Sequence, residues 1–332
     1  MKNLIKKFIF WLLTTIKVHL LFRVINKKRF VILVYHGILK EKTSISCWWQ
    51  LPLDKFEWQL EYLKKHYVVM HLRDVIDKIQ HQEYLPDNVA VITFDDGFEN
   101  NYTVAYPLLK EFNLPVTIFL TTDLIGKHQM LWPDKLFVLF LETKVKEIDL
   151  SNFGLNIFDL TSVEARQESF NLISNQLKTL RLNKKQELIN FIENVLSEER
   201  IPTDYCDNFK LLSWEQVNQM NKTGLVHWGA HTCTHEILSN LDDSDLDDEI
   251  RKSCSKVSSY GNNLLFAYPN GNKKDFDQRA KVILQELNVA CSLTTISGLN
   301  SYSQDVHELK RIEIDNNMTR NRFKLLCSGA LK

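Results

Sequence analysis

The stretch VAVITFDDGFENNY, residues 89–102, decides how this chain folds and where its chemistry lies. A run of apolar and β-branched residues is followed directly by two adjacent aspartates, Asp95 and Asp96, and then by Gly97. Such a run predicts a buried strand that ends in a turn. Two carboxylates in a pocket of low dielectric repel each other, and one takes up a proton unless a cation lies nearby. The pair suggests a bound metal, although a plain Asp-Asp-Gly turn with solvated side chains has the same sequence.

Short apolar runs of this kind recur along the chain and alternate with longer segments of helical period. This alternation is the pattern of a fold built from repeated strand-helix units. A polar-rich segment at about 128–210 shows helical sequence without clear strands and is predicted to be a helical insertion into a domain that covers residues 30–332. The other predicted strands are FVILVYHGI (30–38), VVMHL (68–72), LPVTIFLTT (114–122), LVHWGAHT (225–232), LLFAYP (264–269) and VACSLTT (289–295).

A second group of polar residues follows the predicted strand 225–232 in the sequence HTCTHEIL. His231 and His235 lie four residues apart, which we interpret as two imidazoles on one face of a helical turn, a spacing found in zinc sites. Many such pairs are accidents of a protein surface. Combined with one aspartate of the first site, however, two histidines leave an open coordination position, as a catalytic zinc ion requires. Cys233, between them, is expected to point away, and a thiolate ligand is the alternative.

Two further strand ends contribute candidates, because side chains at the carboxyl ends of parallel strands line the mouth of a barrel. His36 ends the predicted strand 30–38 and precedes a glycine. The turn in FAYPNG ends the predicted strand 264–269, and its backbone amides are candidates to hold an oxyanion, with an ordinary turn as the alternative. The residues of this turn are Tyr268, Pro269, Asn270 and Gly271.

Composition and the chain start limit the possible partners. Forty-one basic residues balance 41 acidic ones, so no net field favours nucleic acid, and none is expected as a partner. Six cysteines are scattered singly, which favours reduced and mostly buried thiols. Residues 1–29 are apolar with basic flanks but lack a small-residue cleavage site, and charged residues interrupt them as a membrane span. We expect one membrane-proximal helix here, with a helix packed on the domain as the alternative.

The motifs TFDDG, HTCTH and FAYPNG, in this order and each at a strand end, resemble those of the NodB-type polysaccharide deacetylases, carbohydrate esterase family 4. The likeness extends through residues 89–126 and the segments LLSWEQVNQM and GAHTCTHEILSNL. The early VYHGI resembles the circularly permuted branch that acts on exopolysaccharides such as poly-N-acetylglucosamine. The resemblance implies a distorted (β/α) barrel, similar to a TIM barrel, and hydrolysis of an N-acetyl group on an amino sugar.

The resemblance also implies a role for each site residue. Asp96, His231 and His235 would hold a divalent metal, most simply Zn²⁺, with Asp95 as the general base and His36 as the acid. Many family members carry an arginine in the third motif, where this chain has Ala267. Arg311, in ELKRIEI, is then the candidate guanidinium that orients the base, and a structural arginine is the alternative.

We therefore predict a metal-dependent carbohydrate N-deacetylase of bacterial surface polysaccharide, membrane-associated or cytoplasmic. Two other functions are compatible with the sequence. One is an amidohydrolase that acts on a small non-sugar amide with the same metal ligands. The other is a catalytically silent glycan-binding module. Tryptophans in the segments CWW and MLWPD are candidate sugar-stacking residues, whereas Trp214 and Trp228 are expected to pack in the core.

Overall fold

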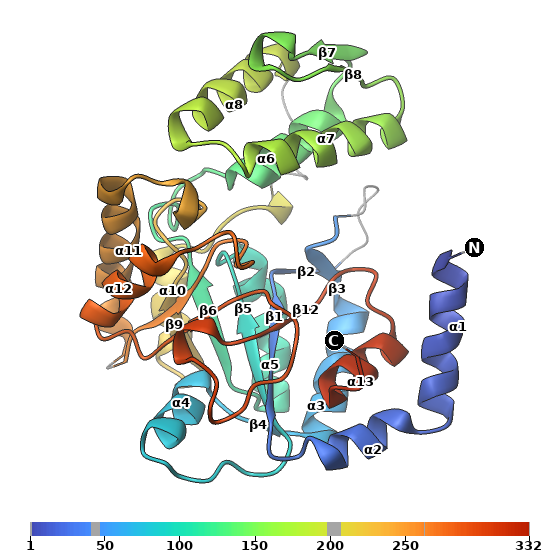
Figure 1. The fold of residues 1–332 in the computed structure, drawn as a ribbon, viewed down its shortest axis with the longest axis vertical. Coiled ribbons are helices and arrows are strands. Elements are labelled where there is room, and N and C mark those ends of the chain that lie inside the picture. Colours follow the sequence, from blue (N-terminus) through green and yellow to red (C-terminus); the bar gives the residue numbers. More distant parts are fainter. Residues whose placement is uncertain (1, 41–46, 198–206, 262, 332) are drawn as a thin grey trace.

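The computed structural model describes residues 2–40, 47–197, 207–261 and 263–331. Its centre is a curved, parallel sheet with the strand order β11-β10-β9-β6-β5-β1-β12, and β4 pairs with β5 outside this path. Helices surround the sheet, which forms a half-barrel (Figure 1). The predicted distorted (β/α) barrel is confirmed. The strands are β1 (Phe30–Tyr35), β4 (Val68–Val69), β5 (Val89–Phe94), β6 (Val116–Leu120), β9 (Val226–Ala230), β10 (Leu265–Ala267), β11 (Cys291–Leu293) and β12 (Ile312–Glu313).

The central strands are buried along their whole length, as the continuous apolar runs require in a sheet that is covered on both faces. Their register sets the height of the residues that follow. Tyr35 pairs with Phe94, so His36 and Asp95 leave the sheet at the same level. Leu120 pairs with Ala230, which brings His231 to the same edge. The carboxyl ends of the strands thus converge on one site.

The helices that cover the sheet follow the predicted alternation. Pro107 lies in the first turn of α5, and the turn before it, Asn101–Ala105, is π-helical because proline has no N–H to complete the regular bond pattern. Sequence reasoning found no helix after Arg311, where the structure has α13. The covering helices are α3 (Leu53–His66), α4 (Leu72–Gln80), α5 (Tyr106–Phe112), α10 (Trp214–Asn221), α11 (Asp243–Val257), α12 (Gln278–Glu286) and α13 (Arg320–Ser328).

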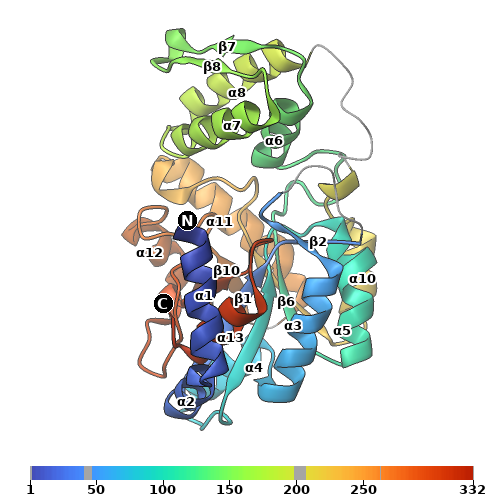
Figure 2. The same cartoon turned by 90° about the vertical axis from the view of Figure 1, so that its right-hand side faces the viewer.

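The insertion forms a separate layer above the carboxyl end of the sheet (Figures 1 and 2). The sequence predicted a purely helical insertion, and this prediction is wrong, because β7 and β8 form an antiparallel ribbon. Its helices pack on one another through buried aliphatic and aromatic side chains. Its elements are α6 (Trp132–Glu142), β7 (Glu147–Asp149), β8 (Ile157–Asp159), α7 (Val163–Leu177) and α8 (Leu182–Leu196).

The first residues form two helices, α1 (Lys2–Thr15) and α2 (Val18–Ile25), and not the single helix that we predicted. The chain breaks at Lys17, which has a left-handed φ of 61°. Both helices contact α13, and Figure 2 shows α1 beside it. Neither helix alone is long and apolar enough to cross a bilayer, while the two together have the length and composition of a span that is bent by 68°.

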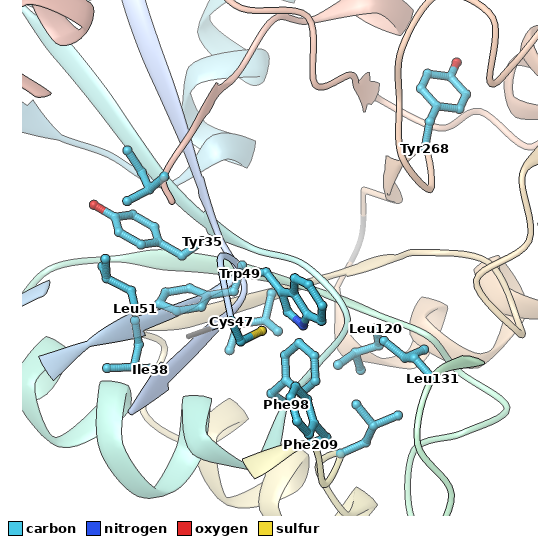
Figure 3. Close-up of a cluster of buried hydrophobic side chains, with 14 of the residues drawn as sticks. Tyr35, Ile38, Cys47, Trp49, Leu51, Phe98, Leu120, Leu131, Phe209 and Tyr268 are labelled. Carbon is cyan, nitrogen blue, oxygen red and sulfur yellow. The ribbon is translucent and has the colours of Figure 1, made fainter. Parts of the chain in front are cut away.

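The main apolar core joins the sheet to its helices and continues into the insertion. Figure 3 shows part of it, beside the short strands β2 (Gly37–Leu39) and β3 (Gln50–Pro52). The Trp49 ring, just before β3, packs against the rings of Phe137 and Phe209, with centroids 5.1 Å and 6.3 Å away. Trp228 is buried in the core, as expected. The five cysteines in the described ranges are free and buried, whereas Cys206 lies outside them.

Candidate active site

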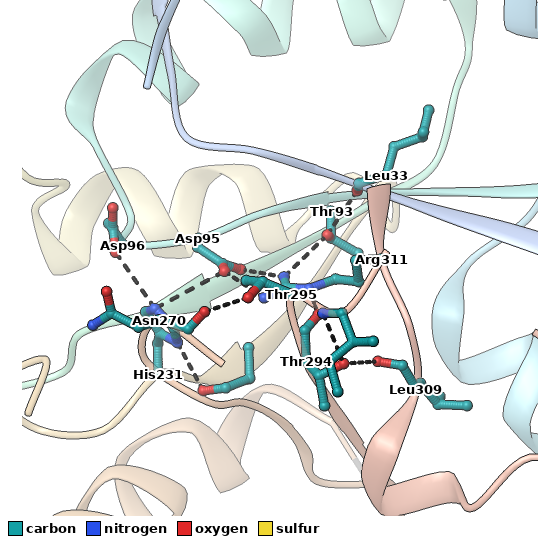
Figure 4. Close-up of polar contacts among 12 residues, drawn as sticks. Leu33, Thr93, Asp95, Asp96, His231, Asn270, Thr294, Thr295, Leu309 and Arg311 are labelled. Atoms are coloured by element: carbon teal, nitrogen blue, oxygen red, sulfur yellow. Dashed lines mark hydrogen bonds and ion pairs between the residues drawn. The ribbon is translucent and has the colours of Figure 1, made fainter. Parts of the chain in front are cut away.

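Asp96, His231 and His235 form a compact group of potential metal ligands at the carboxyl edge of the sheet (Figure 4 labels the first two). Oδ1 of Asp96 lies 3.5 Å from Nε2 of His231 and 3.4 Å from Nε2 of His235. Nδ1 of His231 lies 2.7 Å from the carbonyl oxygen of Ala267, so a proton on Nδ1 is donated to that oxygen and Nε2 presents its lone pair to the site.

This group fits a metal ion on two grounds. Oδ1 of Asp96 is buried and has no hydrogen-bond partner in the described part of the chain, although two imidazole nitrogens face it. Ligand atoms about 2 Å from a tetrahedral zinc ion are about 3.3 Å from one another, close to the two distances observed. Two imidazoles and one carboxylate are also a donor set that zinc accepts.

The segment that carries both histidines is a loop, and the predicted helical turn is wrong. Thr232 and His235 both have left-handed backbone angles, with φ of 63° and 66°. Such angles are costly for a residue other than glycine and cluster at functional sites. Glu249 of α11 fixes the loop, since its Oε2 accepts the N–H of Cys233 at 2.7 Å and that of Thr234 at 3.1 Å.

Arg311 and Asp95 form a buried ion pair beside this group (Figure 4). The guanidinium donates two bonds of 2.7 Å, one to each oxygen of the carboxylate, and a third bond of 2.8 Å to the carbonyl of Thr294. Arg311 is fully buried. The sequence left open whether this arginine was structural, and the structure places it directly on the candidate base.

The pKa values of the two neighbouring carboxyls are shifted in opposite directions. Burial acts to raise the pKa of Asp95, but Arg311 and His231 outweigh it and bring the pKa to about 2. Burial and the negative charge of Asp95 raise the pKa of Asp96 well above its usual value. Adjacent titratable groups with diverging pKa values mark different roles in catalysis. Asp95 is ionised through Arg311, and Asp96 needs a further cation to be ionised.

Of the four residues in the predicted oxyanion turn, the structure brings only Asn270 to the site. The Tyr268 hydroxyl donates to the carbonyl of His307, away from the site, and the N–H of Tyr268 donates to Leu293 in the sheet. The N–H of Gly271 is bonded to Pro269. Gly271 is required for packing, because its φ is +68° and a Cβ there would meet the amide nitrogen of Thr295 at 2.9 Å. Tyr268, Pro269 and Gly271 therefore shape the turn but do not line the cleft.

His36 lies with these groups in a cleft of about 400 Å³, a volume in the range of ligand sites. Its ring meets the half-exposed Trp48 edge to face, with centroids 6.0 Å apart. Burial lowers the pKa of His36 to about 4, so the imidazole is neutral at rest. Cys233 is outside this group, with its thiol near Thr122 and the carbonyl of Asp248.

Comparison with known proteins identifies the family. Residues 82–291, more than half of the chain, match the family model for polysaccharide deacetylases. The chain belongs to the polysaccharide deacetylase family. The Asp-Asp pair and both histidines lie inside the matched region, while His36 and Arg311 lie outside it.

Individual polysaccharide deacetylases resemble parts of this chain. The putative polysaccharide deacetylase YxkH of Bacillus subtilis is 30% identical over 101 residues, which is 30% of this chain and 34% of YxkH. The poly-beta-1,6-N-acetyl-D-glucosamine N-deacetylase of Staphylococcus epidermidis is 26% identical over 175 residues, 52% of this chain and 58% of the relative. The chain thus spans a third to somewhat over half of the length of these relatives.

Solved structures of deacetylases share the fold over nearly the whole chain. Streptococcus pyogenes PplD, in complex with acetate, superposes with a TM-score of 0.57 at 19% identity, and the match covers 91% of this chain and 98% of PplD. IcaB from Ammonifex degensii gives 0.57 at 16% identity, with coverage of 91% and 97%. At these identities the likeness concerns the fold alone.

Several polar residues that line the cleft were not predicted from the sequence, and Asp134 is the most deeply buried of them. Asp134 lies in the first turn of α6 and is 1% exposed. Its Oδ1 accepts the indole N–H of Trp49 at 2.8 Å. In the sequence, WPD is an ordinary helix start with an acidic residue in the first turn, so only the fold of the insertion over the barrel shows that Asp134 reaches the cleft.

Proposed function

We propose that this chain is a metal-dependent hydrolase that removes N-acetyl groups from amino sugars of a bacterial surface polysaccharide or its precursor. The observation that carries the proposal is the division between the two neighbouring carboxyls. Asp95 is ionised and clamped by Arg311, and Asp96 faces two imidazole nitrogens. The activity named for the staphylococcal relative supports an N-acetylglucosamine polymer as the substrate class.

Zn²⁺ is the proposed metal, held by Asp96, His231 and His235. When bound, zinc polarises an acetyl carbonyl and lowers the pKa of a coordinated water to about 7. Ionisation of Asp96 is then favourable, because the positive charge offsets the burial and repulsion that raise its pKa.

Asp95 is the proposed general base. It has no need to bind the metal, since Arg311 already balances its charge. The bidentate guanidinium also fixes the direction of the carboxylate, so the proton of the attacking water is accepted at a defined place. A base with a pKa near 2 is weak, and it removes this proton effectively only from an acidified water.

Asn270 and His36 are proposed to complete the reaction. Asn270 lines the cleft, and its backbone N–H donates to no acceptor in the parts of the chain that the structure describes. It can donate to the oxygen that becomes negative as the amide is attacked. His36, neutral at rest, takes a proton from solvent during the cycle and gives it to the amine nitrogen as the C–N bond breaks, and the proton that Asp95 accepted from water returns to solvent.

Acetate release tests this function. Purified protein loaded with one Zn²⁺ per chain is expected to release acetate from β-1,6-linked N-acetylglucosamine oligomers and to leave small cyclic amides intact. Hydrolysis of the cyclic amides alone would replace the proposal with an amidohydrolase. Glycan binding without any acetate release would identify a silent binding module.

We also infer that residues 1–29 contact the surface of a membrane. Ten of the eighteen exposed large apolar side chains in the described residues lie between Leu4 and Ile25. Among them are Phe8 and Trp11, at 61% and 51% exposure. Three lysines are exposed beside them, at positions 6, 7 and 17. An apolar face with neighbouring lysines favours an anionic bilayer.

A further inference from the structure

The cleft has a wall that the catalytic residues do not form. The insertion supplies it, from the start of α6 and from one face of α7. Leu131, Asp134, Phe170 and Ser174 are the buried members of this wall, and Asn171 and Asn175 are exposed at its rim. A sugar whose acetyl group reaches Asp95 would lie between this wall and the carboxyl ends of the strands.

Asp134 has an oxygen without a partner. Its Oδ1 is held by the Trp49 indole, while Oδ2 is buried and has no hydrogen-bond partner in the described residues. A buried carboxyl oxygen that is left unpaired destabilises the folded protein, so such atoms are uncommon in native proteins. Burial also raises the pKa of Asp134 well above its usual value. The bond to Trp49 accounts for Oδ1, whereas no contact among the described residues accounts for Oδ2.

Ser174, in α7, also has a buried polar atom without a hydrogen-bond partner among the described residues. Its side chain is 7% exposed, and its Oγ has no partner among the described residues. A serine inside a helix usually bonds a carbonyl oxygen of the preceding turn, as Ser253 of α11 does with Glu249 at 2.7 Å. Ser174 lacks this bond and lines the cleft. Two unpaired polar atoms from different helices thus face one cavity.

We propose that Asp134 and Ser174 bind ring hydroxyls of the amino sugar whose acetyl group enters the catalytic centre. This proposal rests on the proposed function and names two residues, Asp134 and Ser174, that would select a hydroxylated sugar ring as the substrate. Hydroxyl groups donate and accept, so one sugar can satisfy both a carboxyl oxygen and a serine hydroxyl. The Trp49 bond fixes the Asp134 carboxyl before the substrate arrives, which reduces the entropy lost on binding. The insertion is then a specificity element for a hydroxylated ring.

Glycan binding to an inactive protein tests the proposal separately from catalysis. In Asp95→Asn protein loaded with Zn²⁺, calorimetry measures the Kd of a β-1,6-linked N-acetylglucosamine oligomer. Adding Ser174→Ala is expected to weaken binding about three- to tenfold, the usual loss for one hydrogen bond. Adding Asp134→Leu is expected to weaken it about tenfold or more. Because Ser174 Oγ has no partner among the described residues, Ser174→Ala is expected to melt no lower than its parent.

Thr117→Val is the matched control, because Thr117 Oγ1 is also buried and unpaired in the described residues but does not line the cleft. It is expected to leave the Kd unchanged. Binding by the Ser174 and Asp134 variants within about twofold of the parent would overturn the proposal, as would an equal loss in Thr117→Val. If the wild type releases no acetate and the parent binds no glycan, the proposed function itself fails.

Discussion

At the scale of single residues, the central feature is that two adjacent aspartates have different partners. The sequence shows only their adjacency. The structure supplies Arg311, which arrives from the far end of the chain and binds Asp95 through both oxygens. Breaking such a buried pair by removing one partner typically costs about 3–5 kcal/mol. The pairing leaves Asp96 as the carboxyl that gains most from a metal ion.

Exchanging each aspartate for asparagine separates their roles. Asp95→Asn is expected to lower turnover at least about a hundredfold while one Zn²⁺ per chain is retained, because the base is lost and the ligands are not. Asp96→Asn is expected to lose most of the metal. Elemental analysis and acetate release check both. The reverse pattern, with metal lost only from Asp95→Asn, would show that the roles are exchanged.

His36 is expected to affect the rate more than substrate binding. His36→Ala removes the proposed proton donor to the amine, so kcat should fall about a hundredfold or more with little change in KM. His81→Ala, at the exposed end of α4, is the control and should behave as wild type. Wild-type rates for His36→Ala would exclude it as the acid.

At the scale of elements, the metal-binding loop depends on α11. Glu249 accepts two N–H groups and the Thr234 hydroxyl, at 2.6 Å for the last, and so holds a loop with unfavourable backbone angles. Glu249→Ala is expected to weaken Zn²⁺ binding about 10–100-fold, the usual effect of losing a group that orients ligands. Asp247→Ala on the same helix, which removes only a surface pair with Arg251, serves as the control in a chelator competition. Equal affinities for the two variants would show that the loop needs no support.

Elements were predictable from sequence where apolar runs are long. β5 and β9 lie where their runs predicted, because buried parallel strands need such runs. The spacing of four in HTCTH predicts a helical turn, but the segment is a loop. The spacing does not show that hydrogen bonds to Glu249 hold the segment in a non-helical conformation. The ribbon β7–β8 depends on tertiary packing, which its sequence does not show. The break between α1 and α2 depends on the left-handed backbone of one residue, Lys17, which the apolar pattern also does not show. Asp134 could not be found, because no local pattern shows that α6 faces the barrel.

At the scale of the whole molecule, the candidate active site lies between the barrel and the insertion, and the exposed apolar surface of α1 and α2 lies away from it. The barrel carries the candidate catalytic residues, and the insertion lies above the carboxyl ends of its strands (Figure 1). Residues of the insertion line part of the cleft. The helices α1 and α2 pack on α13 and leave a row of apolar side chains exposed. Because other elements line the cleft, a deacetylase held at a membrane by α1 and α2 would keep its active site open to glycan.

Sedimentation with vesicles tests the membrane contact. Full-length protein is expected to sediment with vesicles that contain anionic phospholipid and to be released by high salt only in part, because apolar burial is insensitive to screening. Trp11→Glu should reduce the bound fraction severalfold. Ile157→Glu, at a position that is also exposed but lies on the insertion, should not. Equal binding by all three proteins would remove α1 from the contact.

The most direct test of the central claim is a metal titration of acetate release. Chelator-treated wild-type protein is supplied with increasing Zn²⁺, and acetate released from a β-1,6-linked N-acetylglucosamine oligomer is measured. Release should rise linearly with metal and level off at one Zn²⁺ per chain, the capacity of the Asp96, His231 and His235 group. Acetate release that persists without metal, or none at any ratio of metal to protein, would contradict the account.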